Sequence, residues 1–262
     1  MQVGSATDTS TVVAALRDAA SATGSDFHYL LSTAIRESSL RADARSNTSS
    51  AAGLFQFVDQ TWLGLVKTHG AKYGLGAMAD AISKDGEGRY HAASAADRQA
   101  ILGLRTNPQI AALMAGEYSR SSAATMQAAL GRPVCGGELY AAHFLGPDAA
   151  CRLIRASETT PDASAAALFP AAAGANHGVF FHADGTAKSV REVYDWAMRQ
   201  PGATAPVSAG GPGEALQQAA AAPAANAESL LADVMNWQPS GFFAASSPLM
   251  LSPGLLDLLS DS

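Results

Sequence analysis

The sequence predicts an all-α protein on the basis of three observations. Apolar residues recur at the spacing of one helical face in several segments. Helix start signals, such as Asn107-Pro108, precede some of these segments. Strand signals are weak and no internal repeat is visible. At 262 residues, the chain is long enough for one sizeable domain followed by further segments.

Composition narrows the range of functions. Hydrophobic residues make up 48% and charged residues 15%, which is typical of a soluble, alanine-rich globular protein. The net charge of −6 gives no basis for binding nucleic acid through phosphate neutralisation. Residues 1–15 lack the basic and apolar regions of a secretory signal, and no stretch approaches the roughly 20 apolar residues of a membrane span. We therefore expect neither a signal peptide nor a transmembrane segment in this chain.

Two helices are predicted at the start of the chain. The first covers about residues 9–22, with an apolar face that includes Val12 and Leu16. The second begins near Phe27 and ends at Glu37, and its apolar face includes Leu30 and Ala34. Both helices are expected to pack their apolar faces into a core.

Glu37 is the first candidate for chemistry. It lies seven positions after Leu30, so at 100° per residue it falls on the shoulder of the buried face. Burial against apolar side chains disfavours the charged carboxylate, raises its pKa and makes it a proton donor near neutral pH. The alternative is a glutamate in a solvated last turn that pairs with Arg36 or Arg41.

The block Gly53-Leu54-Phe55-Gln56-Phe57 is the second candidate. Glycine allows the backbone to approach a ligand, Phe55 and Phe57 can wall a groove, and the Gln56 amide offers both a donor and an acceptor. Such a set suits a sugar. Simple core packing is the alternative role for the two phenylalanines.

Further elements are predicted along the rest of the chain. Asp59 is expected to cap a helix that ends at Gly70. Residues 71–93 are expected to form a loop with short helical turns. The other predictions are helices over 94–105, 108–131, 138–145, from 147 and over 190–198, with an extended segment at 178–181.

Histidines and cysteines give limited information. The histidines are scattered without the spacing of metal ligands, so we predict no metal and no cofactor. Cys135 and Cys151 form either a disulfide or two unpaired buried thiols, and the sequence does not choose between these states.

Together, Ile35-Arg36-Glu37-Ser38-Ser39 and Gly53-Leu54-Phe55-Gln56-Phe57 resemble the catalytic core of the soluble lytic transglycosylases, the goose-lysozyme-like peptidoglycan lyases. The resemblance covers roughly residues 9–200 and implies a lysozyme-like all-α domain. In that family a glutamate-serine pair is followed by a Gly-Leu-Met-Gln block. By this likeness Glu37 is catalytic, while Ser38 and Gln56 orient the sugar or Glu37.

A third family block, Ala-Tyr-Asn followed by Ala-Gly-Pro, is similar to Ala142-His143-Phe144-Leu145-Gly146-Pro147. Here His143 stands in place of the tyrosine that holds the catalytic glutamate in the family. Tyr140 lies one helical turn before His143 and is placed to supply that hydroxyl. His143 is either a neutral hydrogen-bond partner of Glu37 or an ordinary buried histidine. The groove is expected between these three segments.

The resemblance implies cleavage of the β-1,4 bond between N-acetylmuramic acid and N-acetylglucosamine, with formation of a 1,6-anhydro end. Glu37 would serve as the sole acid and base. One alternative is a hydrolytic lysozyme, in which Asp43 or Asp59 activates a water. Another is a non-catalytic wall-binding or assembly protein.

The chain is expected to divide into a catalytic domain (1–200), an Ala/Pro/Gly-rich linker (201–226) and an amphipathic helical tail (227–262). The expected partners are peptidoglycan glycan strands and, at the tail, a protein of a wall-spanning machine. A wall substrate implies a periplasmic or otherwise extracytoplasmic location in a bacterium.

Overall fold

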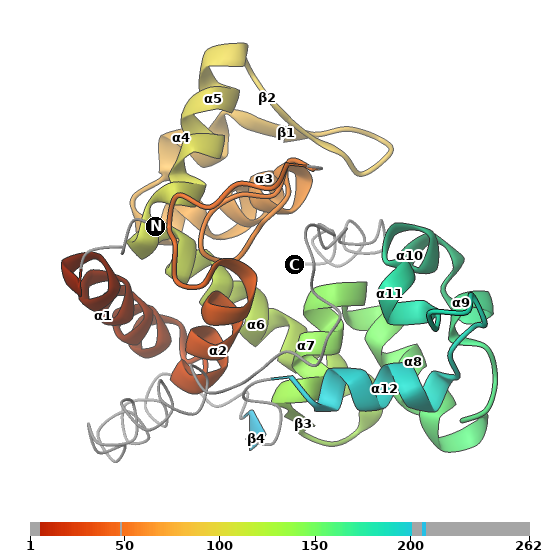
Figure 1. Cartoon of the computed structure of the whole chain (residues 1–262). Coiled ribbons are helices and arrows are strands. Elements are labelled where there is room, and N and C mark those ends of the chain that lie inside the picture. The colour runs from red at the N-terminus through yellow and green to blue at the C-terminus, as the bar shows by residue number, and fades with distance from the viewer. Residues whose placement is uncertain (1–5, 48, 201–205, 208–262) are drawn as a thin grey trace.

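Helices dominate the described part of the chain, which comprises residues 6–47, 49–200 and 206–207 of a computed structural model (Figure 1). This confirms the all-α prediction. The longer helices are α1 (Ala6–Thr23), α2 (Phe27–Ser38), α3 (Asp59–His69), α5 (Ala95–Gly103), α6 (Pro108–Leu130), α7 (Gly136–Leu145), α8 (Pro147–Thr159) and α12 (Val190–Met198). Shorter helical pieces are η1 (Gly70–Tyr73), α4 (Gly76–Asp80), η2 (Leu104–Thr106), α9 (Ala165–Leu168), α10 (Pro170–Ala175) and α11 (His177–Phe180).

The long helix α6 runs through the middle of the molecule (Figure 1). It starts as predicted, because the Asn107 side chain accepts a hydrogen bond from the Ile110 amide at 3.1 Å and Pro108 follows in the first turn. It ends at Gly131, whose φ of +71° is left-handed. α1 packs along α6, and α2, α3, α7 and α8 also contact it.

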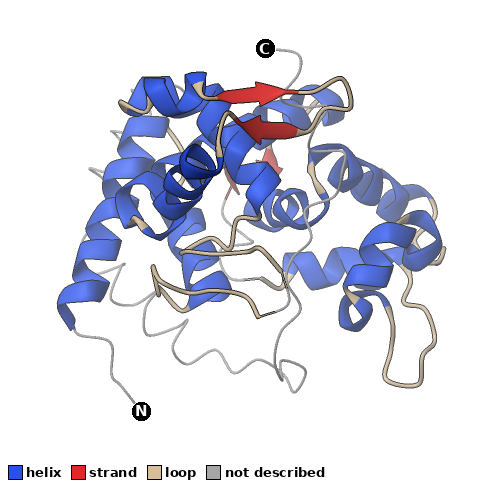
Figure 2. Cartoon of the chain, turned by 90° about the horizontal axis from the view of Figure 1, so that it is seen from above, coloured by secondary structure: helices blue, strands red, loops and turns tan. Residues whose placement is uncertain are grey.

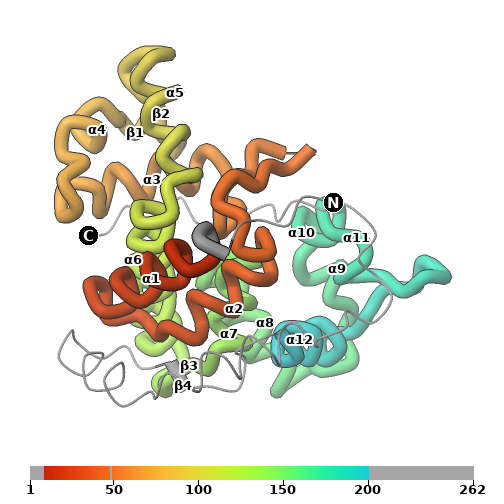
Figure 3. Tube along the Cα trace, turned by 60° about the vertical axis from the view of Figure 1, so that its left-hand side comes forward, coloured from red at the N-terminus to blue at the C-terminus, as the bar shows by residue number. Residues whose placement is uncertain are grey.

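Two groups of elements lie on either side of the middle of α6. Figures 1 and 3 show α4, α5 and the β1–β2 hairpin at one end of the molecule and α9–α12 at the other. α12 begins with the predicted capping box, in which the Ser189 hydroxyl accepts from the Glu192 amide and the Glu192 carboxylate accepts from the Ser189 amide. This helix packs on α7 and α8.

The expected loop at 71–93 is wrong in part, because it contains a β-hairpin. β1 (Ile82–Lys84) pairs antiparallel with β2 (Tyr90–Ala92), with Ile82 opposite Ala92. Figure 2 shows the strands as short arrows among the helices. Three residues are too few to display a period-two pattern, so these strands could not be recognised from the spacing of apolar residues.

Two other local predictions are wrong in whole or in part. The extended segment expected at 178–181 is wrong for its first three residues, which belong to α11, and is confirmed only for Phe181, whose backbone is extended. Asp59 is the first residue of α3 rather than its cap, since Val58 holds the cap position without a side-chain hydrogen bond. The Asp59 carboxylate is directed instead to two arginines, Arg98 and Arg105.

Part of the predicted linker has structure. β4 (Pro206–Val207) pairs antiparallel with β3 (Val134–Cys135), directly before α7. The remainder of the linker and the whole predicted tail, residues 227–262, lie outside the described residues. Within the described chain, no helix is both long and apolar enough to cross a membrane.

The two cysteines are free thiols. Cys135 caps α7, where its backbone amide donates to the Glu138 carboxylate at 3.1 Å. Cys151 is buried on α8. Of the two states that the sequence left open, the structure has the unpaired one.

Candidate functional site

Glu37 lies in the last turn of α2, and both ends of this helix are capped. At the C-terminal end, the Ser39 amide donates to the Ala34 and Ile35 carbonyls. Asp26 caps the start of α2, since its carboxylate accepts from the Tyr29 amide at 2.7 Å. The predicted apolar face is buried, with Leu30 1% and Ala34 0% exposed. Glu37 lies on the shoulder of this face, as the sequence predicts, and its side chain is only 7% exposed.

Burial changes the acidity of Glu37. Removal of water from the carboxylate raises its pKa to about 7, although the nearby Arg36 charge and a hydrogen bond from Tyr140 act in the opposite direction. The alternative prediction, in which Glu37 lies exposed to solvent in the last turn of the helix, is therefore wrong. Glu37 is close to half-protonated at neutral pH, as a general acid that must also act as a base requires.

Helix α7 supplies two groups that face Glu37. The Tyr140 hydroxyl donates to Glu37 Oε1 at 3.4 Å. His143 follows one turn later, and its Nε2 lies 3.8 Å from the same oxygen, which is beyond hydrogen-bond distance. Burial and the Arg36 charge lower the pKa of His143 to about 4, so its imidazole is neutral at physiological pH. Tyr140 is thus the closer partner of Glu37.

Strained backbone follows Glu37. The described residues include three non-glycine positions with positive φ: Ser39 at 53°, Leu40 at 62° and Gln56 at 49°. Residues other than Gly, Asn and Asp rarely adopt this left-handed backbone conformation. Two of the three come directly after the Glu37–Ser38 pair and the third lies in the Gly53–Phe57 block. Such strain concentrates at functional sites.

Ser38 connects these two segments. Its hydroxyl lies 3.0 Å from the carbonyl oxygens of both Ala34 and Leu54, and the residue is buried. The hydroxyl therefore joins the end of α2 to the Gly53–Phe57 block. In the structure the Ser38 hydroxyl holds these two protein segments together. Its one hydrogen is shared between the two carbonyls, so none is left to donate to a sugar.

Gly53 is required for packing rather than for approach of a ligand. Its φ is +81°, and a Cβ atom built on it would lie 1.9 Å from the Arg105 carbonyl oxygen. The expectation that this glycine opens the backbone to a ligand is therefore wrong. It allows the block to lie against the backbone at η2, where Arg105 Nη1 also donates to the Phe57 carbonyl at 2.9 Å.

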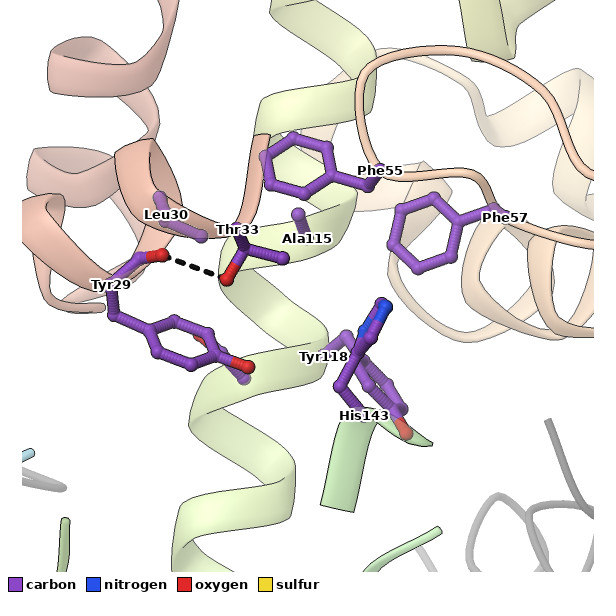
Figure 4. Close-up of a pocket in the computed structure, with 9 residues that line it drawn as sticks. Tyr29, Leu30, Thr33, Phe55, Phe57, Ala115, Tyr118 and His143 are labelled. Carbon is purple, nitrogen blue, oxygen red and sulfur yellow. Dashed lines mark hydrogen bonds between the residues drawn. The ribbon is translucent and has the colours of Figure 1, made fainter. Parts of the chain in front are cut away.

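Phe55 and Phe57 are both 2% exposed and line a small pocket (Figure 4). The Phe57 ring packs edge-on to those of Tyr118 and His143, with centroids 6.3 and 6.5 Å away. The space between these side chains is narrow and partly open to solvent, with room for about one water-sized group. Its lining residues are Tyr29, Leu30, Thr33, Phe55, Phe57, Ala115, Tyr118, Ser119 and His143.

This pocket brings together the three segments that the sequence singled out: α2, the Gly53–Phe57 block and α7. Gln56 lies beside it with part of its surface exposed, and its amide nitrogen donates to the Gly53 carbonyl at 2.9 Å. The same nitrogen also donates to the Ala44 carbonyl at 3.4 Å, so both amide hydrogens of Gln56 are used within the protein and its side-chain oxygen remains as the acceptor.

Of the nine lining residues, only Phe55, Phe57 and His143 belong to the sequence-based site, and Tyr29 and Thr33 are the two missed residues that the pattern around Glu37 could have indicated. Tyr29 and Thr33 precede Glu37 by eight and four positions, so they share its side of α2, and both line the pocket. The Thr33 hydroxyl donates to the Tyr29 carbonyl at 2.8 Å (Figure 4). The i, i+4, i+8 spacing is visible in the sequence and was a usable signal for them.

Neither Asp59 nor Asp43, the two candidates for a second acid, is a buried carboxyl free of strong ion pairs as Glu37 is. Asp59 is engaged by Arg98 and by Arg105, the latter at 2.9 Å. The Asp43 side chain is 87% exposed and lies 3.7 Å from Arg41. Among the described residues, no group of three or more His, Cys, Asp or Glu side chains is arranged to hold a metal ion.

A scan of the chain against models of known protein families finds no match. Support for a function therefore comes from the residues and the geometry described above.

Proposed function

We propose that this protein is a peptidoglycan lytic transglycosylase with a lysozyme-like domain, in which Glu37 is the sole acid and base. The observation that supports this most is the state of Glu37: a buried carboxyl with pKa about 7, contacted by the Tyr140 hydroxyl and 3.8 Å from His143, which lines the aromatic pocket. The three blocks that resemble the family are in contact: Ser38 is hydrogen-bonded to the Leu54 carbonyl, and Glu37 faces Tyr140 and His143 of α7.

The proposed reaction needs no water. Protonated Glu37 donates its proton to the glycosidic oxygen, and the bond from that oxygen to C1 of the muramic sugar breaks. The Glu37 carboxylate then takes the proton of the C6 hydroxyl, whose oxygen bonds to C1 and closes the 1,6-anhydro ring. Glu37 ends protonated, as it began. The internal hydroxyl has a high effective concentration at C1, which favours it over solvent.

A lyase of this kind uses one carboxylate, whereas most glycosidases use a pair. Because Asp59 is bound to two arginines and Asp43 is exposed, a hydrolytic lysozyme with either as water-activating base is less well supported. The substrate places the proposed enzyme outside the cytoplasm, in contact with glycan strands. The partner proposed for the tail concerns residues 227–262, outside the described chain.

The test is mass spectrometry of muropeptides released from purified peptidoglycan by the parent protein and by Glu37→Gln. The proposal expects 1,6-anhydromuramic products from the parent and at least a roughly 1000-fold loss in the variant, because general acid–base catalysis contributes about 10²–10⁴-fold. Reducing-end products would identify a lysozyme instead. Wall binding without products from either protein would favour the non-catalytic alternative.

A further inference from the structure

The Arg36 guanidinium, next to Glu37 in the chain, is enclosed by aromatic rings and hydrogen-bond acceptors. It lies 4.5 Å from the centroid of the Tyr140 ring and 5.5 Å from that of Trp196. Its Nε donates to the Tyr140 hydroxyl oxygen, and its Nη1 donates to the side-chain oxygen of Gln200. The Arg36 side chain is only 11% exposed. A guanidinium held in this way has a fixed position and a fixed orientation.

The C-terminal end of α12 provides half of this enclosure. Trp196 belongs to α12, and Gln200 follows four positions later, where it is 7% exposed. The Gln200 amide nitrogen donates to the Trp196 carbonyl at 2.6 Å. This bond leaves the amide oxygen directed at Arg36. Trp196 also packs edge-on against the Tyr140 ring, with centroids 5.7 Å apart.

The contact with Arg36 determines what the Tyr140 hydroxyl can do. A phenol has one hydrogen to donate. Because the Tyr140 oxygen accepts from Arg36, its hydrogen is free to point at Glu37 Oε1, 3.4 Å away. Arg36 Nε lies 3.8 Å from the same carboxylate oxygen. Arg36 therefore acts on Glu37 through space and through Tyr140.

We propose that Arg36, held by Trp196 and Gln200 of the α12 end, is a positioning residue that directs the Tyr140 hydroxyl to Glu37 and stabilises the carboxylate formed when Glu37 gives up its proton. This inference rests on the proposed function and deepens it. A single acid and base must pass through the ionised state within a buried site, where an unpaired carboxylate is costly. A nearby fixed cation lowers that cost.

The other groups that face Glu37 carry no compensating charge. They are Tyr29 on α2, and Tyr140 and His143 on α7. Burial raises the pKa of both tyrosines far above neutrality and lowers that of His143 to about 4, so all three are neutral at pH 7. Among the described groups around Glu37, Arg36 is thus the cation.

Gln200→Glu tests the inference with almost no change in shape. A carboxylate beside Arg36 competes for its positive charge, so Glu37 should lose stabilisation of its ionised form and its pKa should rise. Since the first step needs protonated Glu37, the alkaline limb of kcat/KM should move to higher pH by about 0.5–1 unit, within the range that one neighbouring charge produces. Arg36→Met should shift the limb in the same direction and also lower kcat.

The matched control is Gln99→Glu, the same substitution at an exposed position of α5, where the limb should stay within about 0.2 pH units of the parent because exposed charges are screened. Glu37 is also titrated directly, by NMR of its 13C-labelled side-chain carboxyl. Parent-like titration of Glu37 in both Gln200→Glu and Arg36→Met overturns the inference, as does an equal shift in Gln99→Glu. A parent without turnover defeats the proposed function alone, and the NMR titration then still decides the role of Arg36.

Discussion

Glu37 and Glu117 are both buried carboxyl groups in one chain, yet they have opposite acidities. The Glu117 side chain is 0% exposed and receives Lys72 Nζ at 2.6 Å, the Tyr73 hydroxyl at 2.6 Å and Arg120 Nη2 at 2.9 Å. Burial raises the pKa of Glu117, but these three hydrogen bonds outweigh it and hold the pKa at about 2. Glu37 has one hydroxyl at 3.4 Å and a guanidinium at 3.8 Å, and its pKa is about 7.

The difference shows that burial alone does not make a carboxyl reactive. A carboxylate can accept about four hydrogen bonds, and each one that it receives stabilises the ionised form. Glu117 receives enough of them to remain ionised and to tie α6 to η1. Glu37 receives few, so it exchanges a proton near neutral pH. The number and distance of donors separates the structural acid from the candidate catalytic one.

The largest expected effect is on the pH dependence of stability, which should have opposite signs for the two acids. The folded pKa of Glu37 is above the ordinary 4.5, so the folded state binds the extra proton between about pH 4.5 and 7. The contribution of Glu37 to the free energy of unfolding is therefore fully present below pH 4.5 and is lost as pH rises through 7. At 1.36 kcal/mol per pKa unit, the loss is about 3 kcal/mol. Urea unfolding of Glu37→Gln should show a variant that gains stability relative to the parent up to pH 8.

Glu117→Gln should change the acid side instead. The folded pKa of Glu117 is below 4.5, so its contribution is present above pH 4.5 and is lost as pH falls toward 2. At pH 7 the variant should be less stable by about 1–3 kcal/mol, the loss expected for hydrogen bonds to a buried charge. The deficit should shrink below pH 4. A deficit at pH 2 that is as large as the one at pH 7 would contradict an ionised Glu117.

Tyr140→Phe should widen the difference between the pKa values of Glu37 and Glu117, because it removes the one hydroxyl that donates to Glu37. We expect turnover to fall about 10- to 100-fold, equivalent to the roughly 1.5–3 kcal/mol of a hydrogen bond to a charged group. The pKa of Glu37 should rise, because this bond lowers it in the parent. The kcat/KM profile over pH 5–9 measures both effects. Unchanged turnover would remove Tyr140 from the site.

The smallest effect is expected for Lys72→Met, which removes one donor from Glu117. Lys72 is 52% exposed, so solvent screens its ion pair, and the loss should be about 0.5–1 kcal/mol at low salt. Added salt should reduce the difference from the parent in urea unfolding. Turnover should stay within about twofold, because Lys72 belongs to the Glu117 cluster rather than to the site around Glu37.

Local sequence patterns predicted much of the helical fold and part of the site. The burial of Glu37 follows from the periodicity of α2, and Asn107-Pro108 gave the start of α6. The β1–β2 hairpin was missed because each strand is three residues long. The role of Gly53 was misjudged because its neighbour, Arg105, lies 52 positions away in the sequence.

The surroundings of Glu37 show the same limit. Tyr140 was anticipated because it lies one turn before His143 on a helix face, a local relation. The contact between Arg36 and Gln200 joins residues 164 positions apart, and the sequence contains no periodic signal that links them. Spacing predicts which side of a helix a residue occupies, whereas partners across the fold depend on how the helices pack.

The left-handed residues around Glu37 have a consequence for mutational tolerance. At Ser39, Leu40 and Gln56, substitution by Gly, Asn or Asp relieves backbone strain, whereas Val or Ile adds to it and Pro cannot reach a positive φ. A saturation library scored for folded protein should therefore accept Gly, Asn and Asp best at Ser39, which is exposed, whereas Leu40 also packs against the core and should tolerate them less.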